Sequence, residues 1–238
     1  MPKYNIFFND NSILDLGVYA VNRPNVPIPE RNIEEKEIKG SDGSLTIDYG
    51  TYKNISIDIE FNFIDNKNFY ERIRVINKWL NNIIDSNIRF TDNSNYFYKV
   101  KYTRCKDIVR EYKVKGSFIV SFICDPYQYL ECGKDEIEIS NNSILNNPSY
   151  IDATPIIKLV GNGIVTLYIN EQPLVINLGQ NITIDCGLKE SYRVISGAKE
   201  YVNTRLTGKY PILAEGRNAI RYTGNITKVC IIPNWRII

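Results

Sequence analysis

The sequence predicts a mainly β protein of two domains. Residues 1–133 are expected to form a sheet-rich domain with one covering helix, and residues 134–238 a β-sandwich or jelly roll. Three observations predict this class. Residues 55–63 alternate strictly between apolar and polar side chains, the pattern of a half-buried strand. Residues 66–85 carry apolar side chains at helical spacing. From Pro155 onward, short apolar runs alternate with turn residues and no further helical pattern follows.

The bulk composition is that of an ordinary globular protein. The chain has 238 residues, of which 43% are hydrophobic and 24% charged, enough for two domains with their own cores. No stretch approaches the roughly 18 apolar residues that span a bilayer, and the start MPKYNIFFNDNS lacks the basic and apolar regions of a signal peptide. We therefore expect neither export nor membrane insertion. Lys and Arg total 29 against 27 for Asp and Glu, so we do not expect sequence-independent DNA binding.

Two strands and one helix define the first domain. The strand over residues 116–124 places Phe118, Phe122 and their alternating neighbours on one face, while Ile119 and Ile123 make the other face partly apolar. This strand is expected to be covered on both sides. The helix is expected from Asn66 to Asp85 with Asp65 as its N-cap. Its apolar stripe consists of Phe69, Ile73, Ile76, Leu80 and Ile83, and its solvent face of Lys67, Glu71, Arg74 and Lys78.

The second domain is expected to begin after residue 133, where Asn- and Ser-rich sequence runs to Pro148. Six short strands are expected there: Ile156–Val160, Ile164–Ile169, Leu174–Leu178, Ile182–Ile184, Ala219–Tyr222 and Lys228–Ile232. The turns between them are expected at Gly161-Asn162-Gly163, Glu171-Gln172-Pro173, Gly179-Gln180-Asn181 and Gly216-Arg217-Asn218, the first of these as a hairpin turn.

The residues needed for common catalysis are missing. The chain has no histidine, which removes the usual general base, nucleophile partner and metal ligand, and it has no phosphate-binding glycine loop. We therefore expect neither an enzyme nor a cofactor or metal site. The number of cysteines is odd and none forms a CxxC pair, which argues against disulfides and zinc; they are expected to be small buried side chains. They are Cys105, Cys124, Cys132, Cys186 and Cys230.

Two other functions stay open at this point. A glycosidase needs only paired carboxylates, but Asp58, Glu60, Glu136 and Glu138 alternate with apolar neighbours, as solvated strand faces do. A carbohydrate-binding module over 134–238 would use exposed aromatic side chains, and the chain has 17 tyrosines but only two tryptophans. Packing in the core is the favoured interpretation of both Trp79 and Trp235.

The C-terminal sequence carries three motifs in order. Residues 211–220 follow the pattern P-x-L-x-x-G-x-N-x-I, residues 224–229 follow G-x-(V/I)-T-K-(V/I), and residues 233–236 read P-x-W-R. Together they resemble the ending shared by distal tail proteins of long-tailed bacteriophages. One departure is Tyr210, which stands before Pro211 where the family usually has phenylalanine.

The N-terminal half resembles the same family. Residues 38–45 are similar to its G-x-D-G turn, Lys78-Trp79-Leu80 to its helix, and Tyr96–Val100 to the strand that follows. The end of the next strand, with Pro126 and Tyr127, is similar to its F-x-C-x-P-(F/Y) pattern. The motif residues are interpreted as structural. They are Gly40, Asp42, Gly43, Trp79, Pro126, Tyr127, Gly216, Asn218, Gly224, Pro233 and Trp235.

Specific roles are expected for six of these residues. Gly40 and Gly43 suit a turn with positive φ. The prolines Pro126 and Pro233 cannot donate to a sheet ladder and are expected to end strands. The remaining two, Gly216 and Gly224, are expected to mark turns.

The resemblance implies a non-catalytic subunit at the distal end of a virion tail, made in the host cytoplasm. It implies an N-terminal β-sandwich with a helix that assembles into a homohexameric ring, and a galectin-like C-terminal sandwich. The implied partners are the tail tube protein, a tail-associated lysin or tail fibre, and receptor-binding proteins, with DNA passing through the lumen but not bound specifically. Loop 22–35, with Pro24, Pro27 and Pro29, is interpreted as an interface element, because prolines limit the disorder lost on docking.

Overall fold

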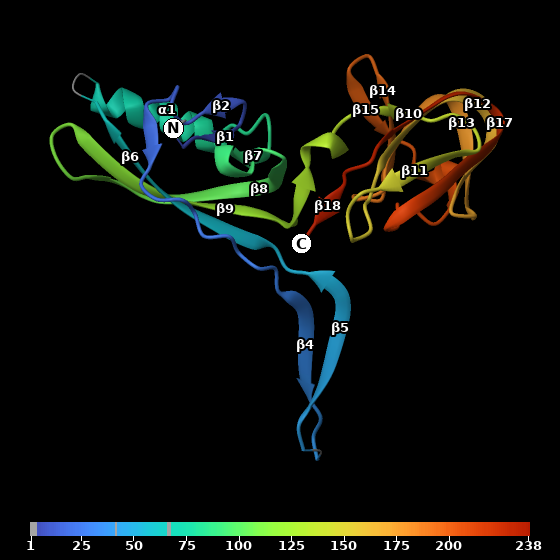
Figure 1. The fold of residues 1–238 in the computed structure, drawn as a ribbon, viewed down its shortest axis with the longest axis horizontal. Helices are drawn as coiled ribbons and strands as arrows, with labels where there is room; N and C mark the ends of the chain where they lie inside the picture. Colours follow the sequence, from blue (N-terminus) through green and yellow to red (C-terminus); the bar gives the residue numbers. More distant parts are fainter. Residues whose placement is uncertain (1–3, 41, 66–67) are drawn as a thin grey trace. The chain divides into compact units, whose positions relative to one another are not determined.

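The computed structural model describes residues 4–40, 42–65 and 68–238. The chain divides into two compact units, Met1–Gln128 with Ile238 and Tyr129–Ile237, and among the described residues each has one cluster of buried apolar side chains. Strands dominate both units (Figure 1), so the predicted mainly β class is confirmed. No helix of the described chain is long and apolar enough to cross a membrane.

The core of the first unit lies between one sheet and the helix α1 (Phe69–Asn81). The strand order is β2-β1-β7-β8-β9-β6-β3, with β6 and β9 antiparallel from Ile55↔Cys124 to Ile64↔Lys115. The inward side chains of β6 alternate with exposed ones along its whole length, as predicted. In chain order, the strands are β1 (Ile6–Phe8), β2 (Asn11–Ser12), β3 (Val18–Ala20), β6 (Ile55–Ile64), β7 (Asn87–Phe90), β8 (Tyr96–Arg110) and β9 (Lys115–Leu130).

The helix is shorter than predicted. It ends at Asn81, so the C-terminal boundary at Asp85 was wrong, and the predicted start at Asn66, with Lys67, lies outside the described residues. Asp65 is not the N-cap residue, since the helix follows Asn68. Its carboxylate nevertheless accepts a hydrogen bond from the Asn68 N–H at 2.8 Å, so it satisfies a backbone donor next to the first turn.

Trp79 anchors the helix in the core, as predicted. Its side chain is 4% exposed and lies edge-on to Phe8 and Phe61, while its indole N–H donates to the Phe8 carbonyl at 2.9 Å. One prediction for the sheet was wrong: Ile119 on β9 is 59% exposed. Its face of the sheet is shared with Asp58 and Glu60 of β6, and within the described part of this unit the helix covers only the opposite face.

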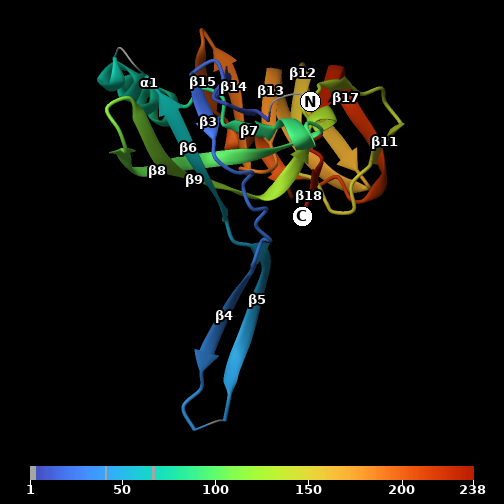
Figure 2. The ribbon, with the colours of Figure 1, turned by 60° about the vertical axis from the view of Figure 1, so that its left-hand side comes forward.

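A separate two-stranded hairpin consists of β4 (Arg31–Glu37) and β5 (Ser44–Tyr52). Figures 1 and 2 show it as a ribbon of its own. The predicted loop over 22–35 therefore ends at Glu30, because β4 begins at Arg31. Gly40 and Gly43, with φ of 87° and 82°, lie between the two strands, which confirms the predicted positive φ.

The second unit is built from one sheet whose long strands continue from one half of the folded sheet into the other. The main order is β10-β17-β12-β13-β14-β15, while β11 also pairs with β17 and β16 with β13. The strands of this sheet are β10 (Ile137–Glu138), β11 (Ser143–Asn147), β12 (Ile156–Ile169), β13 (Gln172–Asp185), β14 (Glu190–Ile195), β15 (Ala198–Tyr201), β16 (Leu206–Gly208) and β17 (Gly216–Ile232). The last strand, β18 (Arg236–Ile237), pairs instead with β9.

Three predicted turns of this unit are wrong, because each lies inside a continuous strand. Gly161-Asn162-Gly163 lies within β12, Gly179-Gln180-Asn181 within β13, and Gly224 within β17. The three interruptions lie close together in the sheet, since Asn162 is paired with both Gly179 and Asn225, and the β12–β17 register shifts there. Such irregularities bend a strand without ending it, so six predicted short strands become three long ones.

The bend lets one sheet enclose its own core. Side chains on both sides of the interruption belong to the same cluster, including Ile157 and Leu167 of β12 and Ile184 and Ile176 of β13. These side chains are at most 1% exposed. The unit is therefore a sandwich-like folded sheet rather than two independent sheets.

The first unit ends before residue 133, at Gln128. The reason is local packing: Leu130 packs against the second core, and its N–H donates to the Trp235 carbonyl at 2.9 Å. Pro126 was predicted to end a strand, but β9 continues through it to Leu130. The neighbouring strand β6 begins at Ile55, opposite Cys124. Pro126 therefore has no partner residue on β6, and its missing N–H costs no hydrogen bond between β6 and β9.

Three of the five cysteines are buried, as predicted. Cys124, Cys186 and Cys230 are at most 4% exposed, while Cys105 is half-buried and Cys132 is exposed. Cys132 contradicts the prediction because it lies in the short 3-10 helix Glu131–Gly133, whose buried residue is Gly133.

Candidate interaction surfaces

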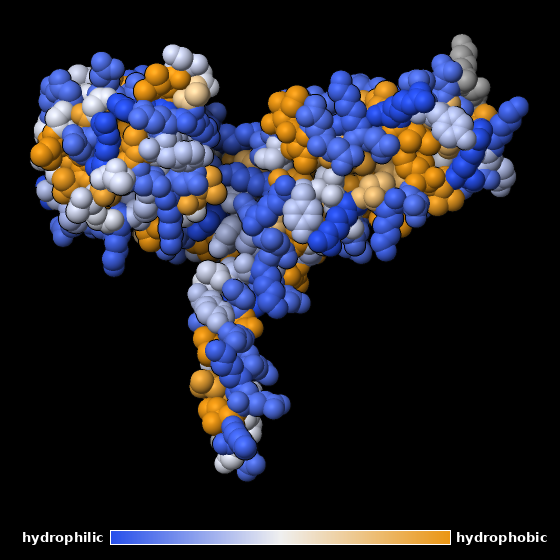
Figure 3. Space-filling model, turned by 180° about the vertical axis from the view of Figure 1, so that it is seen from behind, coloured by the Kyte–Doolittle hydropathy of each residue, from blue (hydrophilic) through white to orange (hydrophobic). Residues whose placement is uncertain are grey.

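The hairpin β4–β5 has two chemically different faces. Cross-strand pairs such as Lys36↔Leu45 and Glu34↔Ile47 place Leu45, Ile47 and Tyr49 on one face. Leu45 is 50% exposed and Tyr49 is 52% exposed. Figure 3 shows hydrophobic surface along this hairpin. These apolar side chains lie along β5, with Glu34 and Lys36 of β4 beside them on the same face. An exposed apolar row on a two-stranded element is typical of a surface that another molecule covers.

The opposite face of the hairpin is acidic. It contains Ile33, Glu35 and Glu37 of β4, with Asp48 paired to Ile33 across the strands. Asp48 forms an ion pair with Arg31 at 3.7 Å. Side chains on both faces of β4 and β5 are mostly exposed, so the described chain supplies no core for the hairpin.

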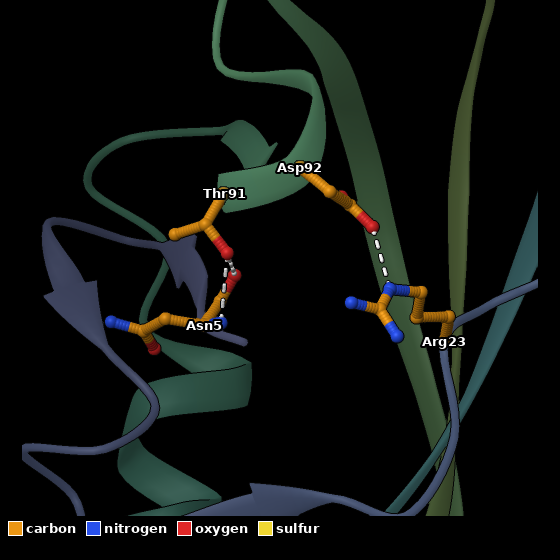
Figure 4. A network of polar contacts seen from close by, with 4 residues as sticks. All are labelled: Asn5, Arg23, Thr91 and Asp92. Carbon is orange, nitrogen blue, oxygen red and sulfur yellow. Dashed lines mark hydrogen bonds and ion pairs between the residues drawn. The ribbon is translucent and has the colours of Figure 1, made fainter. Parts of the chain in front are cut away.

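The segment that leads into the hairpin is anchored at its start. The Arg23 guanidinium donates to the Asp92 carboxylate at 2.9 Å and lies 4.9 Å from the centroid of the Tyr4 ring. Nearby, the Asn5 N–H donates to the Thr91 hydroxyl at 3.0 Å (Figure 4). The two contacts of Arg23 tie this residue to the first unit, while Val26 and Ile28 beyond it are exposed.

A hollow of about 260 Å³ lies beside this anchor. Its walls include Val26, from the segment that leads into the hairpin, and the buried side chains of Ile57, Phe90 and Tyr98. The Tyr98 hydroxyl accepts a hydrogen bond from Gln128 at 2.7 Å, and burial raises the pKa of Tyr98 above its ordinary value. The hollow is smaller than an ordinary ligand pocket, and its size suits a single side chain.

The base of the hairpin carries aromatic contacts. Tyr127, a predicted motif residue, lies edge-on to Tyr52 with ring centroids 6.2 Å apart, and Arg31 lies over the Tyr52 ring at 5.3 Å. Tyr127 therefore contacts the last residue of β5. Three further motif residues, Gly40, Asp42 and Gly43, lie at the turn of the hairpin.

The C-terminal motif residues stabilise the second unit. Asn218 is fully buried, and its amide bonds the backbone of Ala214 in both directions, at 2.8 and 2.9 Å. Gly216, with φ 74°, is the first residue of β17, so the predicted turn Gly216-Arg217-Asn218 is also wrong: its residues lie inside the strand and pair with β11. Pro233 directly follows the end of β17, as predicted.

Trp235 is 4% exposed and packs in the second core, as predicted. Its backbone approaches Gly133 so closely that a Cβ there would lie 2.6 Å from the Trp235 nitrogen. The predicted motif residues therefore fall into separate places: the hairpin turn, the first core, the base of the hairpin and the edge of the second core. They do not form one catalytic constellation, and no cluster of described residues could hold a metal ion.

Two half-buried tyrosines of the second unit, Tyr168 and Tyr192, make poor sugar platforms. Arg221 lies 3.6 Å from the centroid of the Tyr168 ring, and Lys199 lies 4.4 Å from that of Tyr192. Each cation occupies a ring face on which a sugar would stack. The carbohydrate-binding alternative stays a prediction. Asp58, Glu60, Glu136 and Glu138 are exposed, as predicted.

The charge pattern of β8 was missed at the level of the sequence. Residues 99–115 contain seven basic side chains and only two acidic ones, Asp107 and Glu111. Averages over each half of the chain hide this excess. A shorter window would have found it.

Comparison with known proteins supports the fold. No known protein-family model matches the chain, and no curated protein matches its sequence. Its fold is that of a phage hub protein. The structure is similar to that of the SPP1 Dit (gp 19.1) protein, described as a paradigm of the hub adsorption apparatus in phages that infect Gram-positive bacteria. The TM-score is 0.65 at 13% sequence identity, over 99% of each chain.

Proposed function

We propose that this chain is a structural distal tail protein of a long-tailed phage. Copies of the chain form a hexameric ring at the distal end of the virion tail, after synthesis in the host cytoplasm. The ring joins the tail tube protein to a tail-associated lysin or fibre and to receptor-binding proteins, and DNA passes through its lumen. The role requires binding surfaces rather than catalysis.

The observation that carries the proposal is the uncovered amphipathic hairpin. Within the described chain, Leu45 and Tyr49 are half exposed on a ribbon that pairs with neither large sheet. An isolated hairpin is at best marginally stable in water, so an additional surface is needed to bury its apolar face. A second copy of the chain supplies that surface in a ring, where every subunit presents two different complementary faces. The whole-length likeness to a phage hub protein supports placing this assembly in a tail.

The test is the mass of the purified protein over a range of concentrations, with negative-stain images of the same samples. We expect a species of six chains and ring-shaped particles. The double substitution Leu45→Ser with Ile47→Ser is expected to abolish the ring, because it removes the apolar face. Ile164→Ser, at a side chain 74% exposed in the second unit, is the matched control and should assemble normally.

A protein that stays monomeric at the highest concentration, with no ring in the images and none at the distal end of intact tails labelled for this chain, would overturn the proposal. Normal assembly of the Leu45→Ser, Ile47→Ser variant would show that the hairpin is not the surface that carries it.

A further inference from the structure

Strand β8 has an open edge along its second half. Its pairing with β7 reaches Lys99, opposite Asn87, and the Val100 N–H then donates to the Ser86 carbonyl at 2.8 Å. β7 begins at Asn87, yet β8 continues to Arg110. In the described residues, therefore, only β9 flanks the segment 101–110 within the sheet. Open edges are where a further strand can add through backbone hydrogen bonds.

The side chains along this edge form a regular basic row. Tyr102, Arg104 and Lys106 occupy alternate positions, so they share one face of the strand, and all three are exposed. The intervening Thr103 turns the other way, since its hydroxyl donates to the Leu80 carbonyl of the helix at 3.0 Å. Among the described residues, the polar contacts of the Arg104 guanidinium are to the Tyr102 hydroxyl, at 3.0 Å, and to the ring of the same tyrosine. Neither Arg104 nor Lys106 has an ion-pair partner in the described chain.

Strand β4 of the hairpin carries the complementary row. It too has one open edge, because its sheet contains only β4 and β5. Ile33, Glu35 and Glu37 are exposed at alternate positions on the acidic face. Glu35 contacts only the Ser44 hydroxyl, at 3.5 Å, and no cation of the described residues pairs with Glu35 or Glu37.

We propose that the β4 edge of one copy pairs along the open β8 edge of a second copy. Both rows repeat every second residue, about 6.7 Å along a strand, so their charges match in register. Glu35 comes opposite Arg104 in either strand direction, and parallel pairing also brings Glu37 opposite Lys106. The inference rests on the proposed function, since it names the surface that receives the hairpin.

The pairing explains both the chemistry and the geometry of the contact. Backbone hydrogen bonds give affinity, while the charged cross-strand pairs fix the register and the choice of partner. The contact is heterologous, because the donor edge and the acceptor edge belong to different strands. Repetition of such a contact around an axis closes into a ring when the rotation between neighbouring copies divides a full turn.

The test is charge reversal followed by mixing. Glu35→Lys places a lysine opposite Arg104, and Arg104→Glu places two glutamates opposite each other. Each variant alone should associate at least about tenfold more weakly in sedimentation at low salt, since like charges in direct contact cost several kcal/mol. An equimolar mixture restores every contact in an alternating ring, and so does the double variant in a single chain. Rescue also shows that both variants are folded.

Glu215→Lys and Lys209→Glu make the same charge changes at exposed positions of the second unit and should assemble normally. The proposal is overturned if either edge variant assembles like the native protein, or if mixing two defective variants restores nothing. In both cases the native protein still assembles, so the proposed function is not refuted. A native protein that never associates would instead refute the proposed function itself.

Discussion

Asn218→Ala is expected to destabilise the second unit strongly. The side-chain oxygen accepts hydrogen bonds from the Ala214 N–H at 2.8 Å and from the Asn170 amide at 2.7 Å. Its amide donates to the carbonyls of Ala214 and Gly216, at 2.9 and 3.0 Å. One side chain therefore closes the turn that precedes β17 and ties it to the end of β12.

The expected loss follows from these four bonds. A hydrogen bond contributes about 0.5–1.5 kcal/mol net, and a buried group left without a partner costs more. Because the bonds share one side chain, and Ala214 is partly reached by water, their contributions are not independent. We expect the free energy of unfolding to fall by about 3 kcal/mol.

The tryptophans provide the assay, since Trp79 lies in the first unit and Trp235 in the second. In a Trp79→Phe background, the fluorescence of Trp235 reports the unfolding of the second unit by urea. Asn177→Ala, at an exposed asparagine of β13, is the control and should change the free energy of unfolding by less than about 0.5 kcal/mol. A loss below about 1 kcal/mol for Asn218→Ala would refute the reasoning.

Three further outcomes are expected. Gly224→Ala should cost the second unit about 1–3 kcal/mol in urea unfolding, because φ is 93° and the new Cβ would lie 2.9 Å from the Ile164 carbonyl oxygen; an unchanged midpoint would contradict this. In a thiol-labelling time course at pH 8 followed by mass spectrometry, the exposed Cys132 should react first. Cys124 and Cys186 should stay protected, because burial raises the pKa of both thiols to about 12. The first unit should lose stability as the pH rises above 10. Burial raises the pKa of Tyr98 in the folded state above its ordinary value of 10.0, so its contribution to stability is lost as the pH rises through the folded pKa. Tyr98→Phe should flatten that dependence.

Local alternation was enough to predict the strand over residues 55–63, because one of its faces is buried and the other solvated. It was not enough for the second unit. Glycine-rich triplets are locally the same in a hairpin turn and in a bulge. What distinguishes them at residues 161–163 is pairing with residues far away in the sequence, such as Gly179 and Asn225. Only the long-range register shows that the strand continues.

The hairpin strands were missed for a different reason. The turn at Gly40 and Gly43 was predicted, but β4 was taken as a loop. Its alternation of Ile33 with charged residues lacks the buried side chains that make a strand visible in the sequence. The same lack of a core makes the hairpin a candidate interface. Its strand signal was weak because the surface that would cover it belongs to another molecule under the proposed function.

Under the proposed function, the hairpin must also avoid indiscriminate association before a ring forms. Its apolar face is interrupted by the ion pair of Glu34 and Lys36, whose charged atoms are 3.4 Å apart. Charges within an exposed strand face oppose edge-to-edge aggregation, because a partner that cannot compensate them must desolvate them. On the other face, Glu35 and Glu37 repel another copy of the same strand. In the proposed assembly, the hairpin therefore disfavours pairing with its own copy and favours a basic edge, and this difference in partner choice would separate ring closure from aggregation.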